Sequence, residues 1–229
     1  MHPGLTTRST ALGLAALVAV SSLGYWGVSA YRKGQLQKAV TALVKDSSER
    51  LQGTLAVEMK AAPEDNAEMV GKLDDQAQEV DKHVIELRGT SASPNRALVD
   101  AAEEYLLTVR QILRNQAASH RYRIQLAASE QALREHMRKA NRRSGTWIKE
   151  ALRAKDRMEK EYFDYRLSVD TFGRLLESYP ATRSKLALQV GPGLLVDEAV
   201  AANARKRALA TSKRVADDVE RARQLAAVR

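Results

Sequence analysis

The stretch Val70–Leu87, VGKLDDQAQEVDKHVIEL, decides the fold class of this chain. Its apolar side chains recur at intervals of three and four residues, at Val70, Leu73, Ala77, Val80, Val84 and Leu87. This heptad spacing places them on one face of an α-helix and leaves the charged residues on the other face. Because such a face must be covered by another amphipathic element, the stretch predicts a helix packed in a bundle or coiled coil.

Four further apolar stripes of the same kind predict four more helices. Before the first stretch the stripe consists of Leu36, Val40, Val44, Ser47, Leu51, Leu55 and Met59. After it come three stripes: Leu98, Ala102, Leu106, Val109, Leu113, Ala117, His120, Ile124 and Ala128; Trp147, Ala151, Ala154, Met158, Tyr162, Tyr165, Val169, Phe172, Leu176 and Tyr179; and Ala208, Ser212, Val215, Val219, Ala222 and Ala226. We expect bundle helices at about residues 63–88, 94–143, 146–179 and 193–228, preceded by a membrane-proximal helical extension at 32–62.

Proline and glycine residues set the expected helix ends. Pro63 suits the first turn of a helix, and Gly89 is a natural stop for it. Ser93 suits the N-cap of the next helix and Pro94 its first position. Pro180 has no backbone N–H to donate, so we expect the fourth helix to end there, with a short separate helical piece after it.

Composition agrees with an all-α fold and narrows the possible chemistry. Aromatic residues make up only 5% of the 229 residues, whereas alanine and leucine are abundant, which favours helices over a sheet. The chain has no cysteine, which excludes disulfides, thiol catalysis, Cys-based zinc sites and iron–sulfur ligation. We predict an all-α protein in which residues 63–229 form an elongated antiparallel helical bundle or coiled-coil domain.

The N-terminal end carries a predicted membrane anchor. Residues 9–31 contain no charged residue, and at about 1.5 Å per residue such a helix crosses a hydrocarbon core of about 30 Å. Trp26 and Tyr31 suit the interface of a retained span, whereas a cleaved signal peptide is the alternative, with cleavage after residues 28–30. We predict a short tail at 1–8 and a single-pass anchor in the inner cell membrane, with the side of the bundle left open between periplasm and cytoplasm.

Charge predicts which helices are neighbours. Residues 64–88 carry eight acidic and three basic side chains, whereas residues 110–143 carry nine basic and two acidic ones. We therefore expect the second helix to lie beside the basic half of the third, although each exposed ion pair contributes only about 0–1 kcal/mol. The same apolar seams could instead pair between two chains in a coiled-coil dimer, and the sequence leaves both arrangements open.

No catalytic or metal-binding motif is recognisable in the sequence. The Glu-x-x-His, H-E-x-x-H, P-loop and dinucleotide patterns are all absent. We interpret Glu79, His83 and Glu86 as a solvated helix face. His120 lies on the apolar stripe and is interpreted as a satisfied or partly exposed bundle histidine, with a pH-sensing role as the alternative. We expect no enzymatic activity, no cofactor and no metal.

A basic cluster near the end of the third predicted helix is the strongest candidate for an interaction site. It comprises Arg134, Arg138, Lys139, Arg142 and Arg143, opposed only by Glu135. Three of the arginines repeat every four residues, so they repel one another unless an anion neutralises them. Anionic lipid or an acidic protein surface could do so; nucleic acid is the least expected ligand because no stacking aromatic residues interleave with the bases. A solvated helix end is the alternative interpretation.

Together these patterns predict a membrane-anchored, non-enzymatic helical bundle. We expect it to act as a scaffold, tether or accessory subunit of a membrane or envelope complex, through a protein partner or through self-association along its seams. Two alternatives stay open: a ligand-sensing bundle, and anionic-lipid or nucleic-acid binding through residues 134–143. No small-molecule substrate is evident from the sequence.

Overall fold

The computed structural model describes residues 7–57, 63–90, 95–138 and 144–227, with side chains from Tyr31 onward except at 63–65, 225 and 227. This part of the chain contains helices and no strand, which confirms the predicted all-α class. The helices are α1 (Thr7–Leu55), α2 (Pro63–Gly89), α3 (Arg96–Arg138), α4 (Gly145–Val190) and α5 (Glu198–Ala227), with a 3-10 turn η1 (Pro192–Leu194) before α5.

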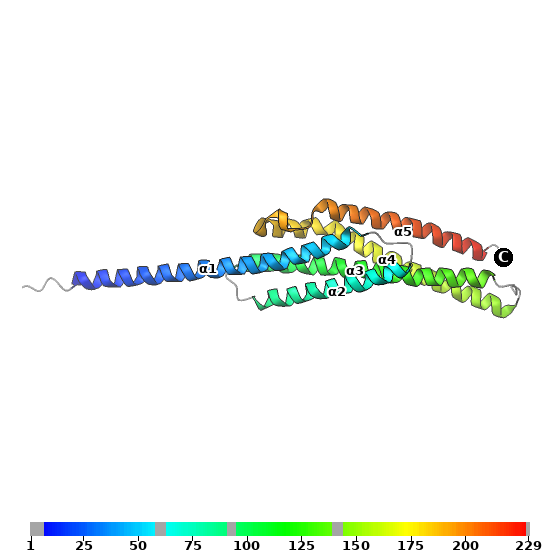
Figure 1. The fold of residues 1–229 in the computed structure, drawn as a ribbon, viewed down its shortest axis with the longest axis horizontal. Coiled ribbons are helices and arrows are strands. Elements are labelled where there is room, and N and C mark those ends of the chain that lie inside the picture. Colours follow the sequence, from blue (N-terminus) through cyan, green and yellow to red (C-terminus); the bar gives the residue numbers. More distant parts are fainter. Residues whose placement is uncertain (1–6, 58–62, 91–94, 139–143, 228–229) are drawn as a thin grey trace, which may run out of the picture.

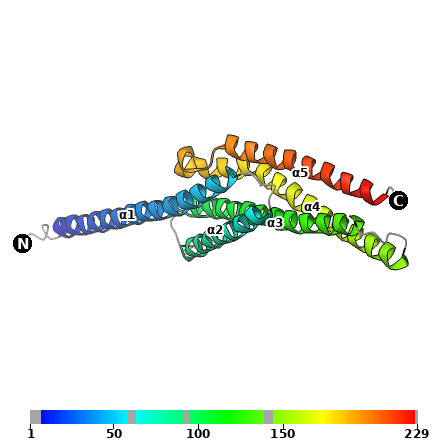
Figure 2. The ribbon, with the colours of Figure 1, turned by 45° about the vertical axis from the view of Figure 1, so that its right-hand side comes forward.

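Successive helices run in opposite directions along one long axis, as Figures 1 and 2 show. The N-terminal part of α1 projects from one end of the bundle. The end of α3 and the beginning of α4 form the opposite end. α3 lies in the centre and contacts each of the other four α-helices. The described part of the molecule is therefore an elongated rod.

Two apolar cores follow one another along this rod. The first joins all five α-helices and includes Leu51, Leu73, Leu113 and Leu176. The second lies toward the far end and joins only α3, α4 and α5, with Leu126, Leu133, Met158, Tyr165, Val169, Val215, Val219 and Ala222. Each buried Leu or Val contributes about 1.5–3 kcal/mol, so both cores hold the helices together through the faces that the stripes define.

Most residues of the predicted stripes lie in these cores, but α3 buries more than one stripe. Ala128, predicted to face inward, is exposed. Tyr105, Ile112 and Gln116, which lie outside the predicted stripe, are buried instead. α3 has neighbours on several sides, so the single predicted stripe does not describe all of its buried surface.

A chain of hydroxyl groups crosses the first core. Ser48 Oγ donates to the Val44 carbonyl at 2.8 Å and lies 2.7 Å from the Tyr105 hydroxyl. The Tyr105 hydroxyl lies 3.2 Å from that of Tyr179, which donates to the Val196 carbonyl at 3.1 Å. These contacts join α1, α3, α4 and the segment before α5 in the interior of the protein.

The expected end of the fourth helix at Pro180 is wrong, because α4 continues to Val190. Pro180 costs about 3 kcal/mol in a helix interior, but the apolar face extends beyond it. Thr182 and Leu186 are buried on the same helix, and burial of Leu186 and its neighbours outweighs the missing hydrogen bond. The last helix starts at Glu198 rather than at residue 193.

Side-chain caps set two other helix starts. Asn95 Oδ1 accepts from the Leu98 N–H at 3.4 Å at the start of α3, two residues after the expected cap at Ser93. Ser93 and Pro94, which the sequence suggested for this start, lie outside the described residues. Ser144 caps α4 by accepting from the Trp147 N–H at 3.1 Å, at the break predicted there.

The predicted contact between the acidic second helix and the basic part of the third is confirmed. Arg110 Nη1 lies 2.7 Å from Asp81 Oδ1, and Arg114 binds the other oxygen of the same carboxylate. One acid of α2 therefore bridges two bases of α3 one turn apart. Most residues of both seams are also buried within this single chain.

In the part of the chain whose side chains are described, no helix is long and apolar enough to cross a membrane. The predicted span at 9–31 precedes that part except for Tyr31, so its side chains lie outside the described residues. The backbone of this segment belongs to α1, which continues as one helix from Thr7 into the first core.

Candidate functional site

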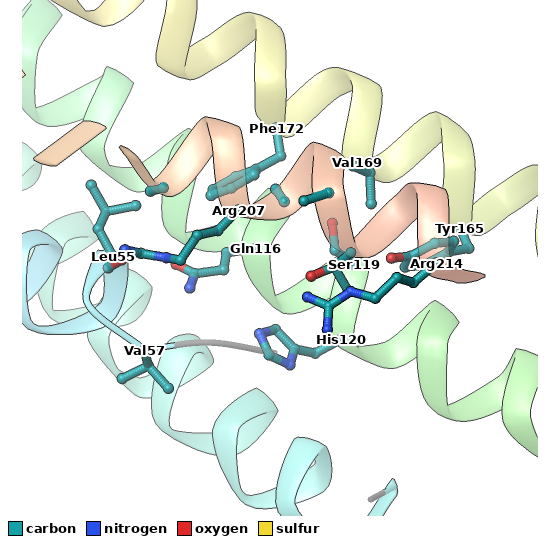
Figure 3. A pocket seen from close by; sticks show the side chains of 14 residues that line it. Leu55, Val57, Gln116, Ser119, His120, Tyr165, Val169, Phe172, Arg207 and Arg214 are labelled. Carbon is teal, nitrogen blue, oxygen red and sulfur yellow. Dashed lines mark hydrogen bonds between the residues drawn. The ribbon is translucent and has the colours of Figure 1, made fainter. Parts of the chain in front are cut away.

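A cavity of about 100 Å³ lies where α1 ends at Leu55 while α3, α4 and α5 continue (Figure 3). Its walls come from α1 and the residues just after it, α3, α4 and α5. The lining residues are Leu55, Val57, Gln116, Ser119, His120, Tyr165, Val169, Phe172, Ala204, Arg207, Ala208, Ala210, Thr211 and Arg214. Aliphatic and aromatic side chains dominate this set, and its charged members are both arginines.

Gln116 places an unsatisfied acceptor in the interior of this site. Its side chain is 7% exposed, and its Nε2 donates to the Thr54 carbonyl at 3.1 Å. That hydrogen bond fixes the orientation of the amide, because rotation by 180° would place two oxygen atoms against each other. The Oε1 atom is buried and has no hydrogen-bond partner among the described residues. A buried acceptor without a donor costs about 1–3 kcal/mol, so this atom favours a donor from outside the chain.

His120 follows Gln116 by one turn of α3 and is neutral at physiological pH. Its side chain is buried, and burial lowers its pKa to about 4. The Nδ1 atom lies 2.9 Å from Asn66 Oδ1. Since the amide oxygen can only accept, Nδ1 carries the proton, and Nε2 is the acceptor. His120 is thus a bundle histidine with a hydrogen-bond partner, which agrees with the satisfied histidine among the predicted alternatives; it is buried rather than partly exposed.

Two arginines of α5 border the same cavity. Arg207 Nη2 donates to the Leu55 carbonyl at the C-terminal end of α1, which satisfies one of the carbonyl groups that a helix end leaves free. Arg214 is exposed and extends from α5 across the cavity toward His120 (Figure 3). Neither arginine is paired with an acidic side chain in the described part of the chain. The site therefore carries uncompensated positive charge.

A second buried polar group lies further along α3 and was not singled out by the sequence. The Glu130 side chain is 6% exposed, and its Oε1 atom lies 3.6 Å from Arg123 Nη1, too far for a hydrogen bond. Burial raises the pKa of the Glu130 carboxyl, and the nearby arginines offset this only in part. Glu130 therefore links turns of α3 near the second core, where one carboxylate lies between the guanidinium groups of Arg123 and Arg134.

Two residues of the predicted basic cluster, Arg134 and Arg138, belong to the C-terminal part of α3, which lies at the end of the rod opposite to the projecting part of α1. Arg138 is exposed at the last position of α3, and Arg134 Nη2 lies 3.7 Å from Glu130 Oε2. Lys139, Arg142 and Arg143 lie outside the described residues. Glu130 is therefore an acidic neighbour of this cluster in addition to Glu135.

The other polar candidates behave as structural groups. His83 Nδ1 lies 2.9 Å from Ser47 Oγ, and its Nε2 lies 3.5 Å from Asp46 Oδ2, which ties α2 to α1. Glu79 accepts from Lys82 at 2.6 Å, and this hydrogen bond lowers the pKa of the Glu79 carboxyl. Among the described residues no group of three or more His, Cys, Asp or Glu side chains could hold a metal ion.

The sequence pointed to His120 but not to the site around it. Gln116 offered a weak signal, since a polar residue lies within one turn of stripe positions 113 and 117. No protein-family model, curated protein or solved structure matches the chain.

Proposed function

We propose that this protein is a membrane-anchored tether with a structural rather than a catalytic role. The observation that carries the proposal is the continuity of α1, a single helix of 49 residues. Its first half contains the uncharged segment at 9–31, and its second half supplies Val40, Val44, Leu51 and Leu55 to the first core. A continuous helix is a stiff connection between its two halves. An anchor in the first half would therefore orient the whole bundle relative to the membrane.

The dimensions of the bundle suit this role. The 43 residues of α3 span about 65 Å at 1.5 Å per residue. α3 leads away from the projecting part of α1, so its last residue, Arg138, would be held several tens of ångström from the lipid surface. The tether would present the basic cluster at that distance to an acidic surface of a protein partner. This arrangement disfavours binding of the cluster to lipids of the anchoring membrane.

Extraction of membranes with alkaline carbonate tests the anchor. Two arginines in the uncharged segment, Leu14→Arg with Leu17→Arg, should release the protein into the soluble fraction, because each costs about 2.5–3.5 kcal/mol near the centre of a span. The matched control places the same charges on the bundle surface, at the exposed residues Leu152 and Leu188. Release of the unaltered protein by carbonate, or equal release of both variants, would contradict an integral anchor.

Energy transfer to labelled lipids tests the tether itself. The chain has no cysteine, so Arg32→Cys and Arg138→Cys each create a unique labelling site, the first directly after the uncharged segment and the second at the far end of α3. In vesicles of neutral lipid with an acceptor on the headgroup, we expect strong transfer from position 32 and weak transfer from position 138. Comparable transfer from both positions would show that the bundle lies flat, which would refute the tether.

The same measurement distinguishes the alternative in which the basic cluster binds lipid. If it does, transfer from position 138 rises when anionic lipid is included and falls again at high salt, because exposed charges are screened. The tether predicts the same weak transfer from position 138 in neutral and anionic vesicles.

A further inference from the structure

We propose that the cavity at the end of α1 binds a small 2-hydroxy carboxylate, with the carboxylate at Arg214 and the hydroxyl group at Gln116. This inference concerns the interior of the bundle and does not depend on attachment to a membrane. Three properties of the site carry it: its charge, its unsatisfied acceptor and its size.

Charge selects an anion. Arg207 and Arg214 are the charged residues that line the cavity, and no acidic side chain is among the lining residues. Arg207 already donates to the Leu55 carbonyl, whereas Arg214 has no hydrogen bond or ion pair with any described residue. A carboxylate that reaches Arg214 can accept two parallel hydrogen bonds from its guanidinium, which is the strongest neutral-pH partner for that group. A cationic amine would be repelled by both arginines.

The acceptor on Gln116 selects a donor group on the same ligand. Its Oε1 atom is buried and has no hydrogen-bond partner in the described part of the chain. Gln116 itself is one of the residues that line the cavity. A hydroxyl group can donate to this oxygen without carrying positive charge past the two arginines. The acceptor is locked in place because the Nε2 of the same amide donates to the Thr54 carbonyl. A carboxylate without a hydroxyl group would leave the cost of the unsatisfied oxygen unrelieved.

Size restricts the ligand to a few carbon atoms. The cavity of about 100 Å³ is smaller than the 300–1,000 Å³ typical of pockets for drug-sized molecules. It is also smaller than an apolar cavity of about 150 Å³ that accepts benzene. Val169, Phe172 and Ala208 supply apolar wall around the polar groups. A three- or four-carbon acid fits this combination, with its short alkyl group against the wall.

Calorimetric titration of the full-length chain in detergent micelles tests the proposal, with 2-hydroxypropanoate as the probe. Three relatives of similar size isolate each feature: propanoate lacks the hydroxyl group, alanine carries an ammonium group in its place, and 1,2-propanediol lacks the carboxylate. We expect 2-hydroxypropanoate to bind at least about tenfold more tightly than each of the three, since one lost hydrogen bond to a fixed site corresponds to about that factor.

Two variants assign the contacts, and a third serves as the control. Arg214→Gln should weaken binding of 2-hydroxypropanoate at least about tenfold. Gln116→Leu should remove the preference for 2-hydroxypropanoate over propanoate. Lys213→Gln removes the same charge from the exposed neighbour of Arg214 and should leave binding unchanged. Arg214 is exposed, so its variant retains the fold, which the helical circular dichroism signal verifies.

Three results would overturn the proposal. One is absence of a binding signal with 2-hydroxypropanoate at millimolar concentration in the unaltered protein. Another is equal binding of 2-hydroxypropanoate and propanoate, which would mean that water alone satisfies Gln116. The last is an equal loss of binding in the Arg214→Gln and Lys213→Gln variants, which would reduce the effect to nonspecific attraction by a basic surface.

Discussion

Removing both hydroxyl groups next to Tyr105 should destabilise the protein by more than the sum of the two single removals. The groups are Ser48 Oγ, 2.7 Å from the Tyr105 hydroxyl, and the Tyr179 hydroxyl, 3.2 Å from it. All three side chains are buried, so water cannot replace a lost partner. The stability of each variant therefore depends on whether a protein oxygen remains to accept the Tyr105 proton.

A count of protons sets the expected pattern. The three hydroxyl groups hold three protons, but the chain from the Val44 carbonyl to the Val196 carbonyl contains four contacts. Ser48 donates to Val44 and Tyr179 donates to Val196. The Tyr105 proton can therefore serve either neighbour but not both at once. When one neighbouring oxygen accepts this proton, the other neighbour remains available as an alternative acceptor.

Each single variant leaves the Tyr105 hydroxyl one of its two acceptors. In Ser48→Ala the Tyr105 hydroxyl donates to Tyr179, and in Tyr179→Phe it donates to Ser48. The Val196 carbonyl also keeps a donor in Tyr179→Phe, because Arg183 Nε lies 2.9 Å from it. Neither change leaves a buried group unsatisfied, so each should cost the net value of one hydrogen bond, about 1 kcal/mol.

The double variant leaves the Tyr105 hydroxyl with no acceptor in this network. A buried unsatisfied donor costs about 1–3 kcal/mol, and this amount should appear as a coupling energy beyond the two single effects. In a Tyr105→Phe background the donor is absent. The coupling between Ser48→Ala and Tyr179→Phe should then vanish, which makes that background the matched control.

Urea unfolding of the full-length chain in detergent micelles, followed by circular dichroism, measures these free energies. The slope of the unfolding free energy against urea concentration should be the same for all variants, so that a change in the urea midpoint reports a change in stability. Additivity of the two single changes within about 0.5 kcal/mol would refute the reasoning, since uncoupled sites behave in that way. Equal coupling in the Tyr105→Phe background would refute it as well.

Three further predictions follow from single residues. Pro180→Ala restores a backbone donor inside α4 and should stabilise the protein by about 1–3 kcal/mol, measured as a raised urea midpoint; a lowered midpoint would mean that the packing requires the proline. The pKa of His120 is about 4 in the folded protein and about 6.5 in the unfolded chain. The unfolded chain therefore binds the proton first as pH falls. Stability should drop by about 2 kcal/mol from pH 7 to pH 5, and His120→Gln should remove most of this loss; an unchanged pH profile in that variant would contradict burial of a neutral ring. Asp81→Asn removes the pairs with Arg110 and Arg114 and should cost less than about 1 kcal/mol in urea unfolding at low salt, with no difference at 1 M salt; an undiminished cost at high salt would rule out a screened ion pair.

Local patterns predicted the helices well because a helical face is a property of neighbouring residues. The spacing of Leu73, Ala77, Val80, Val84 and Leu87 places them on one side of any helix, and all five are buried. Local patterns failed at Pro180. They predicted the cost of a proline inside a helix, but not the burial of Leu186 and its neighbours that outweighs this cost. They also failed at Ala128, because the orientation of each turn of α3 depends on which helix lies opposite.

The candidate site was largely beyond sequence reasoning. Arg207 and Leu55 are 152 positions apart in the chain, yet a hydrogen bond joins them at the edge of the cavity. No periodicity relates such residues. The buried acceptor of Gln116 is equally invisible in the sequence, since a glutamine near a stripe can face water as readily as a cavity.

The sequence by itself determined the all-α class, the apolar face of each helix and the electrostatic preference of the second helix for the third, because each depends on residue order within a few turns. Tertiary structure decided how these faces share two cores, why α3 is central and where α1 stops short of its neighbours. It also placed Arg134 and Arg138 toward the end of the bundle opposite to the projecting part of α1. These features arise from packing between segments distant in the chain, where volume must be filled and charges compensated in three dimensions.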